Sequence, residues 1–125
     1  DVSNLAVSKN SAYPWSPKVL RAGMGAHFRM RIFTSLSLED IKKQTKNVCL
    51  VADARGGQSL FDTVWGENGQ KTIWVFGNEG QGVSEETLKL SDKRLIIPLN
   101  PAVESLNVAM AATVCLFEQK RRRVV

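Results

Sequence analysis

Three short apolar runs, each followed by glycine or small polar residues, constrain the fold of this chain more than any other feature. They are NVCLVAD at 47–53, TIWVF at 72–76 and RLIIPL at 94–99, and their β-branched residues are typical of buried strands. Segments with helical patterns separate the runs. Because strands that alternate with helices build parallel sheets, the sequence predicts the α/β class, with a mainly parallel sheet flanked by helices.

Serine residues mark where several helices are expected to begin. Ser16 and Pro17 suit the N-cap and the first position of a helix that should continue through Phe28. Gly23 and Gly25 lie inside this segment, where each costs about 1 kcal/mol relative to alanine, so a close approach by a helix or a ligand is expected there. Further elements are expected at 5–8 (strand end), 38–45 after Ser37 (helix), 59–65 (helix), after Ser84 (helix), and from Ser105 to Arg123 (helix).

The last of these helices carries small and apolar residues on one face, which favours close packing. The face consists of Val108, Ala111, Ala112, Cys115, Leu116 and Gln119. The run KRRR at 120–123 follows it. We interpret this run as a solvated helix end that complements the helix dipole, with RNA contact as the alternative.

The composition is that of a basic chain without metal or membrane signals. It has 17 Lys and Arg against 12 Asp and Glu, a net charge of +5 that suits a polyanion such as RNA, although many basic proteins bind no nucleic acid. Cys49 and Cys115 lie in apolar runs without metal-ligand spacing, and His27 has no Cys or His companion, so no metal is expected. No apolar stretch approaches the roughly 18 residues of a membrane span. Without a signal-peptide pattern, a cytoplasmic location is expected.

Small and polar residues fill the three loops at the ends of the strands, ADARGG, GNEGQG and PLNPAVESLN. In parallel sheets, ligands bind at the carboxyl ends of strands, so these loops are the expected site. A phosphate-binding loop is excluded because no Gly-Lys-Ser or Gly-Lys-Thr is present. The glycines at 77–82 are spaced G-x-x-G-x-G, which differs from the dinucleotide fingerprint.

Two of these loops lie in long motifs. IWVFGNEGQGVS and LIIPLNPAVESLNVAMAATVCLFEQKRR resemble the second and third signature motifs of the SpoU-type RNA ribose methyltransferases of the SPOUT superfamily, and SPKVLRAGMGAHFR resembles the preceding helix. The resemblance implies methylation of a ribose 2′-hydroxyl in tRNA or rRNA, with S-adenosylmethionine as cofactor. It further implies a deep trefoil knot in the C-terminal part and a homodimer formed through the knot helices.

The resemblance also assigns roles to particular residues. Those expected to bind the cofactor are Ala54, Phe76, Gly77, Asn78, Gly80, Gly82, Ile97, Leu99, Ser105 and Leu106. Those expected around the transferred methyl group are Glu79, Ser105 and Asn107. The reaction needs the hydroxyl in line with the methyl carbon and a group that takes its proton.

The chain departs from the family pattern at its beginning. The first family motif, an Asn followed shortly by an Arg that activates the hydroxyl, has no counterpart. We therefore expect 1–125 to be a SpoU-like domain without its N-terminal strands and first motif, inactive alone and part of a longer or processed protein. The alternative function is a non-catalytic RNA-binding or assembly module that keeps the knot.

Structural roles alone are the alternatives for single site residues. The three glycines at 77, 80 and 82 could serve only a tight strand-to-helix turn. Glu79 could brace its own loop, and Ser105 could cap the last helix. Asn107 has no such obvious structural role. These alternatives remain open at the level of sequence.

Overall fold

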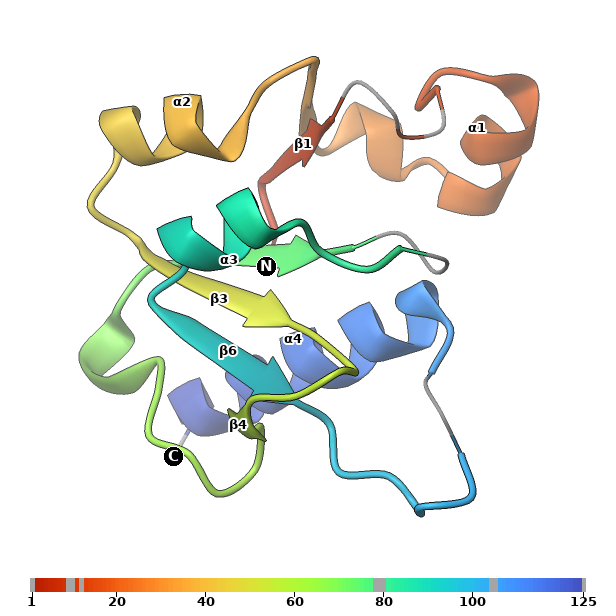
Figure 1. The fold of residues 1–125 in the computed structure, drawn as a ribbon. Helices are drawn as coiled ribbons and strands as arrows, with labels where there is room; N and C mark the ends of the chain where they lie inside the picture. The colour runs from red at the N-terminus through yellow and green to blue at the C-terminus, as the bar shows by residue number, and fades with distance from the viewer. Residues whose placement is uncertain (1, 9–10, 12, 78–80, 104–105, 125) are drawn as a thin grey trace. The chain divides into compact units, whose positions relative to one another are not determined.

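The structure, a computed structural model, describes residues 2–8, 11, 13–77, 81–103 and 106–124. Figure 1 shows its helices and strands. The chain divides into two compact units, Asp1–Gln44 and Thr45–Val125. Each unit is described separately.

The first unit contains a pair of parallel strands and three short helices. Its elements are β1 (Asn4–Val7), α1 (Pro17–Gly23), the 3₁₀ helix η1 (Ala26–Phe28), β2 (Arg31–Thr34) and α2 (Leu38–Gln44). Asn4 lies opposite Arg31 in the parallel register. The strand end predicted at 5–8 is confirmed as β1.

The second unit is built on a four-stranded parallel sheet with the strand order β4-β6-β3-β5. Its elements are β3 (Val48–Ala52), β4 (Gln58–Ser59), η2 (Glu67–Gly69), β5 (Thr72–Phe76), α3 (Glu85–Leu90), β6 (Lys93–Ile96) and α4 (Val108–Val124). All three predicted strands are confirmed, although β6 ends at Ile96 rather than near 99. The predicted class, a mainly parallel sheet flanked by helices, is confirmed.

Serine caps begin three of the helices, as predicted. The side-chain oxygens of Ser16, Ser37 and Ser84 each accept a hydrogen bond from the backbone N–H three residues later, at 3.1–3.3 Å. The donors are Val19, Asp40 and Thr87. Each cap satisfies one of the N–H groups that a helix leaves unpaired at its start.

The first of these helices is shorter than predicted. The continuous helix expected through Phe28 is wrong, because α1 ends at Gly23 and two residues in the left-handed region follow. Met24 has φ 48° and Gly25 has φ 86°, so the backbone turns before the short η1 helix. Glycine accepts this conformation without a steric cost, which explains the residue at position 25.

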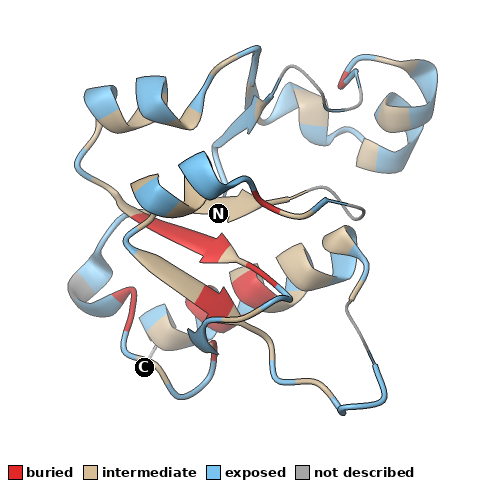
Figure 2. Cartoon of the chain, in the orientation of Figure 1, coloured by how far each residue is buried: buried red, intermediate tan, exposed pale blue. Residues whose placement is uncertain are grey.

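The core of the second unit lies between the sheet and α4. Leu50 and Leu95 from the strands pack with Cys115 of α4, and Leu60 and Trp65 complete the cluster. Figure 2 shows the buried residues gathered on β3, β6 and α4. The predicted small apolar face of α4 is confirmed, since each of its members is buried or half-buried.

Both cysteines are buried, as the sequence indicated. Cys49 is 0% and Cys115 is 1% exposed. Burial raises the pKa of the Cys115 thiol to about 12. The thiol therefore stays protonated at neutral pH and behaves as a small apolar side chain.

The segment 59–65 is not the predicted helix, because Ser59 ends β4 and residues 60–62 form a turn. The guanidinium of Arg122 lies 4.1 Å from the centroid of the Trp65 ring. It donates hydrogen bonds of 2.7–3.4 Å to the carbonyl oxygens of Leu60, Phe61, Thr63 and Trp65. These carbonyl groups are satisfied by a side chain from α4, so the segment needs no helical hydrogen bonds. Because the Arg122 side chain is only 18% exposed, the interpretation of 120–123 as a solvated helix end is wrong for this residue.

Candidate functional site

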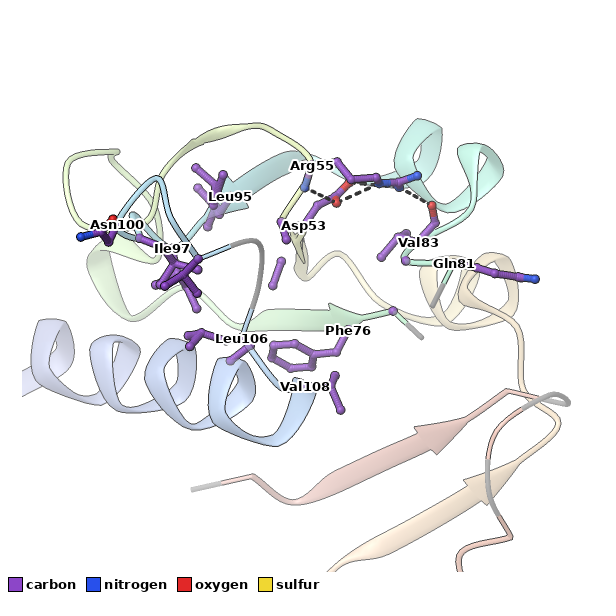
Figure 3. A pocket seen from close by; sticks show the side chains of 18 of the residues that line it. Asp53, Arg55, Phe76, Gln81, Val83, Leu95, Ile97, Asn100, Leu106 and Val108 are labelled. Carbon is purple, nitrogen blue, oxygen red and sulfur yellow. Dashed lines mark hydrogen bonds and ion pairs between the residues drawn. The ribbon is translucent and has the colours of Figure 1, made fainter. Parts of the chain in front are cut away.

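A cavity of about 420 Å³ opens where the carboxyl ends of β3, β5 and β6 meet the start of α4. Figure 3 shows the side chains around it. Its lining combines residues of the three loops predicted to form the site with residues of β5, β6 and α4 or next to them: Ala52, Asp53, Ala54, Arg55, Phe76, Gly77, Gln81, Gly82, Val83, Leu95, Ile96, Ile97, Leu99, Asn100, Pro101, Val103, Leu106, Val108 and Ala111. This is the position at which parallel sheets bind ligands.

Most of the residues expected to bind a cofactor lie at this cavity. The lining residues among them are Ala54, Phe76, Gly77, Gly82, Ile97, Leu99 and Leu106. The others, Asn78, Gly80 and Ser105, lie outside the described residues, as does Glu79. Their roles remain predictions.

An apolar wall forms one side of the cavity. Phe76 at the end of β5 faces Leu106 and Val108 in Figure 3, with Ile97 nearby. The ring of Phe76 is stacked on that of Trp74, with centroids 6.0 Å apart and an angle of 12° between the planes. Stacking of this kind fixes the ring that faces the cavity. Such a wall suits a flat, largely apolar part of a ligand.

A buried carboxylate forms the opposite, polar side. The side chain of Asp53 is 2% exposed, and its oxygen Oδ2 pairs with a guanidinium nitrogen of Arg94 at 2.8 Å. Arg55 adds hydrogen bonds of 3.0–3.2 Å from its backbone N–H and its guanidinium. Burial alone would raise the pKa of Asp53, but these hydrogen bonds and the two positive charges lower it below its usual value. The carboxyl group is therefore ionised at neutral pH.

Arg55 connects two of the loops beside the cavity. A nitrogen of its guanidinium donates to the carbonyl oxygen of Val83 at 2.6 Å, while the same group is held by Asp53. Figure 3 shows this chain of contacts from the loop after β3 to the glycine-rich loop after β5. Sequence reasoning did not single out Asp53 or Arg55. The only signal was their position in ADARGG, directly after a buried strand.

Close packing within the loop itself explains Gly77. A Cβ atom added there would lie 2.4 Å from the carbonyl carbon of Gly82 and 2.7 Å from the backbone nitrogen of Val83. Gly82 has φ 68°, which also favours glycine. For these two positions the loop's own geometry requires glycine, whatever the ligand.

Asn107 has a structural role that the sequence did not reveal. Its side-chain oxygen accepts a hydrogen bond of 2.8 Å from the backbone N–H of Ala109, and its carbonyl accepts one from Ala111. Asn107 is thus the N-cap of α4, which begins at Val108 and not near 105. Its neighbours Leu106 and Val108 line the cavity, whereas Asn107 itself is exposed and does not line it. Its assignment to the methyl-transfer site remains a prediction.

The described part of the chain offers no cluster of three or more His, Cys, Asp and Glu side chains that could hold a metal ion. None of the helices in these residues combines the length and apolar character needed to cross a membrane. The cavity with its polar and apolar sides is the candidate ligand site of the second unit.

Comparison with known proteins identifies the family. A model of the SpoU rRNA methylase family matches residues 1–117. The chain belongs to this family. The SpoU chain is 34% identical to the human protein "rRNA methyltransferase 3, mitochondrial", over 96% of the chain and 40% of that protein. It is 35% identical to an uncharacterised tRNA/rRNA methyltransferase of Synechocystis, over 98% of the chain and 44% of that protein.

Solved structures of SpoU and related methyltransferases have the same fold. The SpoU methyltransferase AviRb from Streptomyces viridochromogenes, in complex with the cofactor AdoMet, matches with a TM-score of 0.86 and 29% identity, covering 97% of this chain and 48% of that one. A putative RNA methyltransferase of the TrmH family from Porphyromonas gingivalis matches with a TM-score of 0.85 and 32% identity, covering 97% and 49%. The SpoU chain thus spans less than half the length of the curated relatives and of the structures described here.

Proposed function

We propose that this chain is the cofactor-binding part of an S-adenosylmethionine-dependent methyltransferase that modifies a ribose 2′-hydroxyl of tRNA or rRNA. The observation that carries the proposal is the cavity at the carboxyl ends of β3, β5 and β6 in a chain of the SpoU family. The AdoMet complex of the similar AviRb supports the cofactor, and the names of the relatives support RNA as the substrate.

The residues of the cavity fit this cofactor. Its volume of about 420 Å³ lies within the range of roughly 300–1,000 Å³ that is typical of ligand sites. The apolar wall of Phe76, Ile97 and Leu106 suits the adenine ring, and the strand ends provide backbone polar groups for the rest. When bound, S-adenosylmethionine supplies a methyl group on a positively charged sulfur.

The remaining roles follow from the family and are part of the proposal. Glu79, Ser105 and Asn107 would surround the ribose hydroxyl, and Asn78, Gly80 and Ser105 would complete the cofactor site. The segment from the loop after β6 into α4 would form the trefoil knot, and the helices of the knot would form a homodimer. A cytoplasmic location is proposed from the sequence alone.

Cofactor binding can be tested with a variant that fills the cavity and a matched control. Ala111 and Ala109 both lie in the first turn of α4, but only Ala111 lines the cavity. Calorimetric titration should detect binding of S-adenosylmethionine to the chain. We expect Ala111→Leu to weaken it by about tenfold or more, because a leucine would occupy ligand volume, and Ala109→Leu to leave it unchanged. Failure of the folded chain to bind would refute the cofactor assignment.

The reaction needs a separate measurement. Labelled S-adenosylmethionine, a pool of tRNA and rRNA, and the chain or a longer protein that contains it would show whether the methyl group is transferred. Digestion to nucleosides would then distinguish a labelled ribose from a labelled base. If a longer protein that contains the chain binds the cofactor but labels no RNA, the alternative of a non-catalytic RNA-binding or assembly module is favoured.

A further inference from the structure

Large apolar side chains in the first unit are exposed to an unusual degree. Phe28 is 93%, Met24 is 91% and Tyr13 is 65% exposed. Met24 is the C-cap of α1 and Phe28 ends η1, so both project from the tight turn that interrupts the predicted helix. Isolated exposed apolar residues are ordinary, but several on one turn usually mark an interaction site.

His27 holds this turn to the preceding loop. Its ring nitrogen Nε2 is 2.6 Å from the carbonyl oxygen of Pro14, and its ring lies 5.1 Å from that of Trp15. A Cβ atom at Gly23 would be 2.8 Å from the His27 ring, so glycine provides the space for this packing. Because Tyr13 adjoins Pro14 and Phe28 adjoins His27, this hydrogen bond brings the backbone segments that carry the two exposed aromatic residues close together.

The charged side chains in this stretch of sequence are all positive. Positions 2–38 contain five Lys and Arg and no Asp or Glu. Arg21 and Arg29, both exposed, flank the turn in sequence. We call Tyr13, Met24 and Phe28 together with Arg21 and Arg29 the turn surface.

Like charge argues against a second copy of the chain as the partner. In a two-fold symmetric dimer the same patch meets itself, so the arginines of one turn surface would face those of the other. Exposed aromatic rings beside cations are what single-stranded nucleic acids bind, because bases stack on the rings and phosphates pair with the cations.

We propose that the turn surface binds single-stranded RNA, with Phe28 stacking on a base and Arg21 and Arg29 contacting phosphates. This inference rests on the proposed function, because RNA is the substrate there. It adds a binding surface in the first unit, whose residues are distinct from those that line the cofactor cavity. The expected ligand is an unpaired loop or end of RNA rather than a duplex, since only unpaired bases can stack on Phe28.

Binding of a short fluorescein-labelled single-stranded RNA of mixed sequence, followed by anisotropy, tests the proposal. Phe28→Ala should raise Kd by roughly tenfold, as for the loss of one stacked base. The matched control is Phe61→Ala, since Phe61 is 48% exposed and lies outside both the turn surface and α4. Both side chains are exposed, so neither substitution is expected to unfold the chain.

The salt dependence separates the two kinds of contact. The logarithm of the RNA association constant falls with the logarithm of the salt concentration, and each phosphate contact to a single strand adds about 0.7 to the steepness of this fall. Arg29→Gln should therefore make the slope less steep by about 0.7, whereas Phe28→Ala should leave the slope unchanged. If the wild-type chain binds RNA and Phe28→Ala behaves like Phe61→Ala, the turn surface is refuted while the proposed function stands. No RNA binding by the wild type would instead count against the RNA substrate itself. A Phe28→Ala chain that loses a dimer in light scattering but keeps its RNA affinity would assign the surface to a second copy and overturn the proposal.

Discussion

At the scale of single residues, Arg55 determines how two loops beside the cavity are held together. Its guanidinium binds the Asp53 carboxylate and the Val83 carbonyl at the same time. We predict that Arg55→Lys raises the Kd for S-adenosylmethionine by about fivefold to tenfold, because lysine keeps the charge but loses the forked geometry that reaches both partners. Calorimetry would measure the change. Arg121→Lys, at an ion pair with Glu118 away from the cavity, is the control and should leave Kd unaltered.

Gly77 gives a second prediction at this scale. A methyl group there would collide with the backbone of Gly82, which cannot move aside as the end of a flexible side chain could. We expect Gly77→Ala to lower the free energy of unfolding by about 1–3 kcal/mol, the usual cost of overpacking. Gly56→Ala is a matched control, since the nearest atom to its added methyl group would be an Arg94 side-chain atom at 3.8 Å. Urea unfolding of both variants would measure the difference, and equal stabilities would contradict the packing argument.

At the scale of elements, α4 holds the segment 60–65 in place through Arg122. We predict that Arg122→Ala lowers the free energy of unfolding by about 2–4 kcal/mol, because several carbonyl groups lose a hydrogen bond and the Glu118 carboxylate keeps only Arg121 of its two arginine partners. The adjacent Arg123→Ala should change it by less than about 0.5 kcal/mol. Arg123 is exposed and makes one hydrogen bond of 3.5 Å, to the carbonyl of Gln70. Denaturant titration compares the two, and a similar loss in both would show that position on the helix, not the network, matters.

The same network should make stability depend on pH. A hydrogen bond from Arg121 lowers the pKa of Glu118 most, burial opposes it, and Arg122 lowers it further, so the pKa falls to about 2. In the unfolded chain a glutamate takes up its proton near pH 4.3. The folded state therefore gains stability from this group above that pH and loses it as pH falls from about 4.3 to 2. Glu118→Gln should flatten this part of the stability curve, measured by denaturant unfolding at a series of pH values, and an unchanged curve would contradict the assignment.

Elements that depend on local sequence were the ones that sequence could predict. The strands follow from apolar runs, and the helix starts at 16, 37 and 84 follow from serine caps, both of which are short-range signals. The segment 59–65 looked helical by itself, but Arg122, far along the chain, satisfies its carbonyl groups. A contact between residues this distant leaves no local pattern, so only the folded structure could reveal it.

At the scale of the whole molecule, the residues of the candidate site also fall into two groups, those that the sequence could predict and those that depend on tertiary contacts. Family motifs pointed to loop residues such as Gly77 and Leu106, and these line the cavity. Asp53 and Arg55 were not singled out, because their role depends on a parallel topology that brings the loop after β3 against the loop after β5. The cap at Asn107 was missed because the helix start was expected earlier. The resemblance therefore located the site, and the tertiary contacts explain how it is held.

The two units are expected to differ in their ability to fold alone. Apart from Pro14, the buried apolar residues in the described parts of the chain, from Cys49 to Cys115, belong to the unit that starts at Thr45, and so does the whole lining of the cavity. We predict that a truncated chain of residues 45–125 remains folded and binds S-adenosylmethionine within about threefold of the full chain, because its core and its site are both intact. A peptide of residues 1–44 should be largely unfolded, since a pair of strands without a core is marginal in water.

Circular dichroism during thermal unfolding and calorimetric titration of both pieces would test this division. A cooperative transition in 45–125 together with cofactor binding is the expected result. If 45–125 folds but binds much more weakly than the full chain, the first unit contributes to the site through contacts beyond the cavity lining. If 45–125 does not fold, its stability depends on the first unit, and the compactness of each unit in the structure does not reflect independent folding. Loss of RNA binding in a folded 45–125 chain that still binds the cofactor would agree with an RNA-binding surface on the first unit.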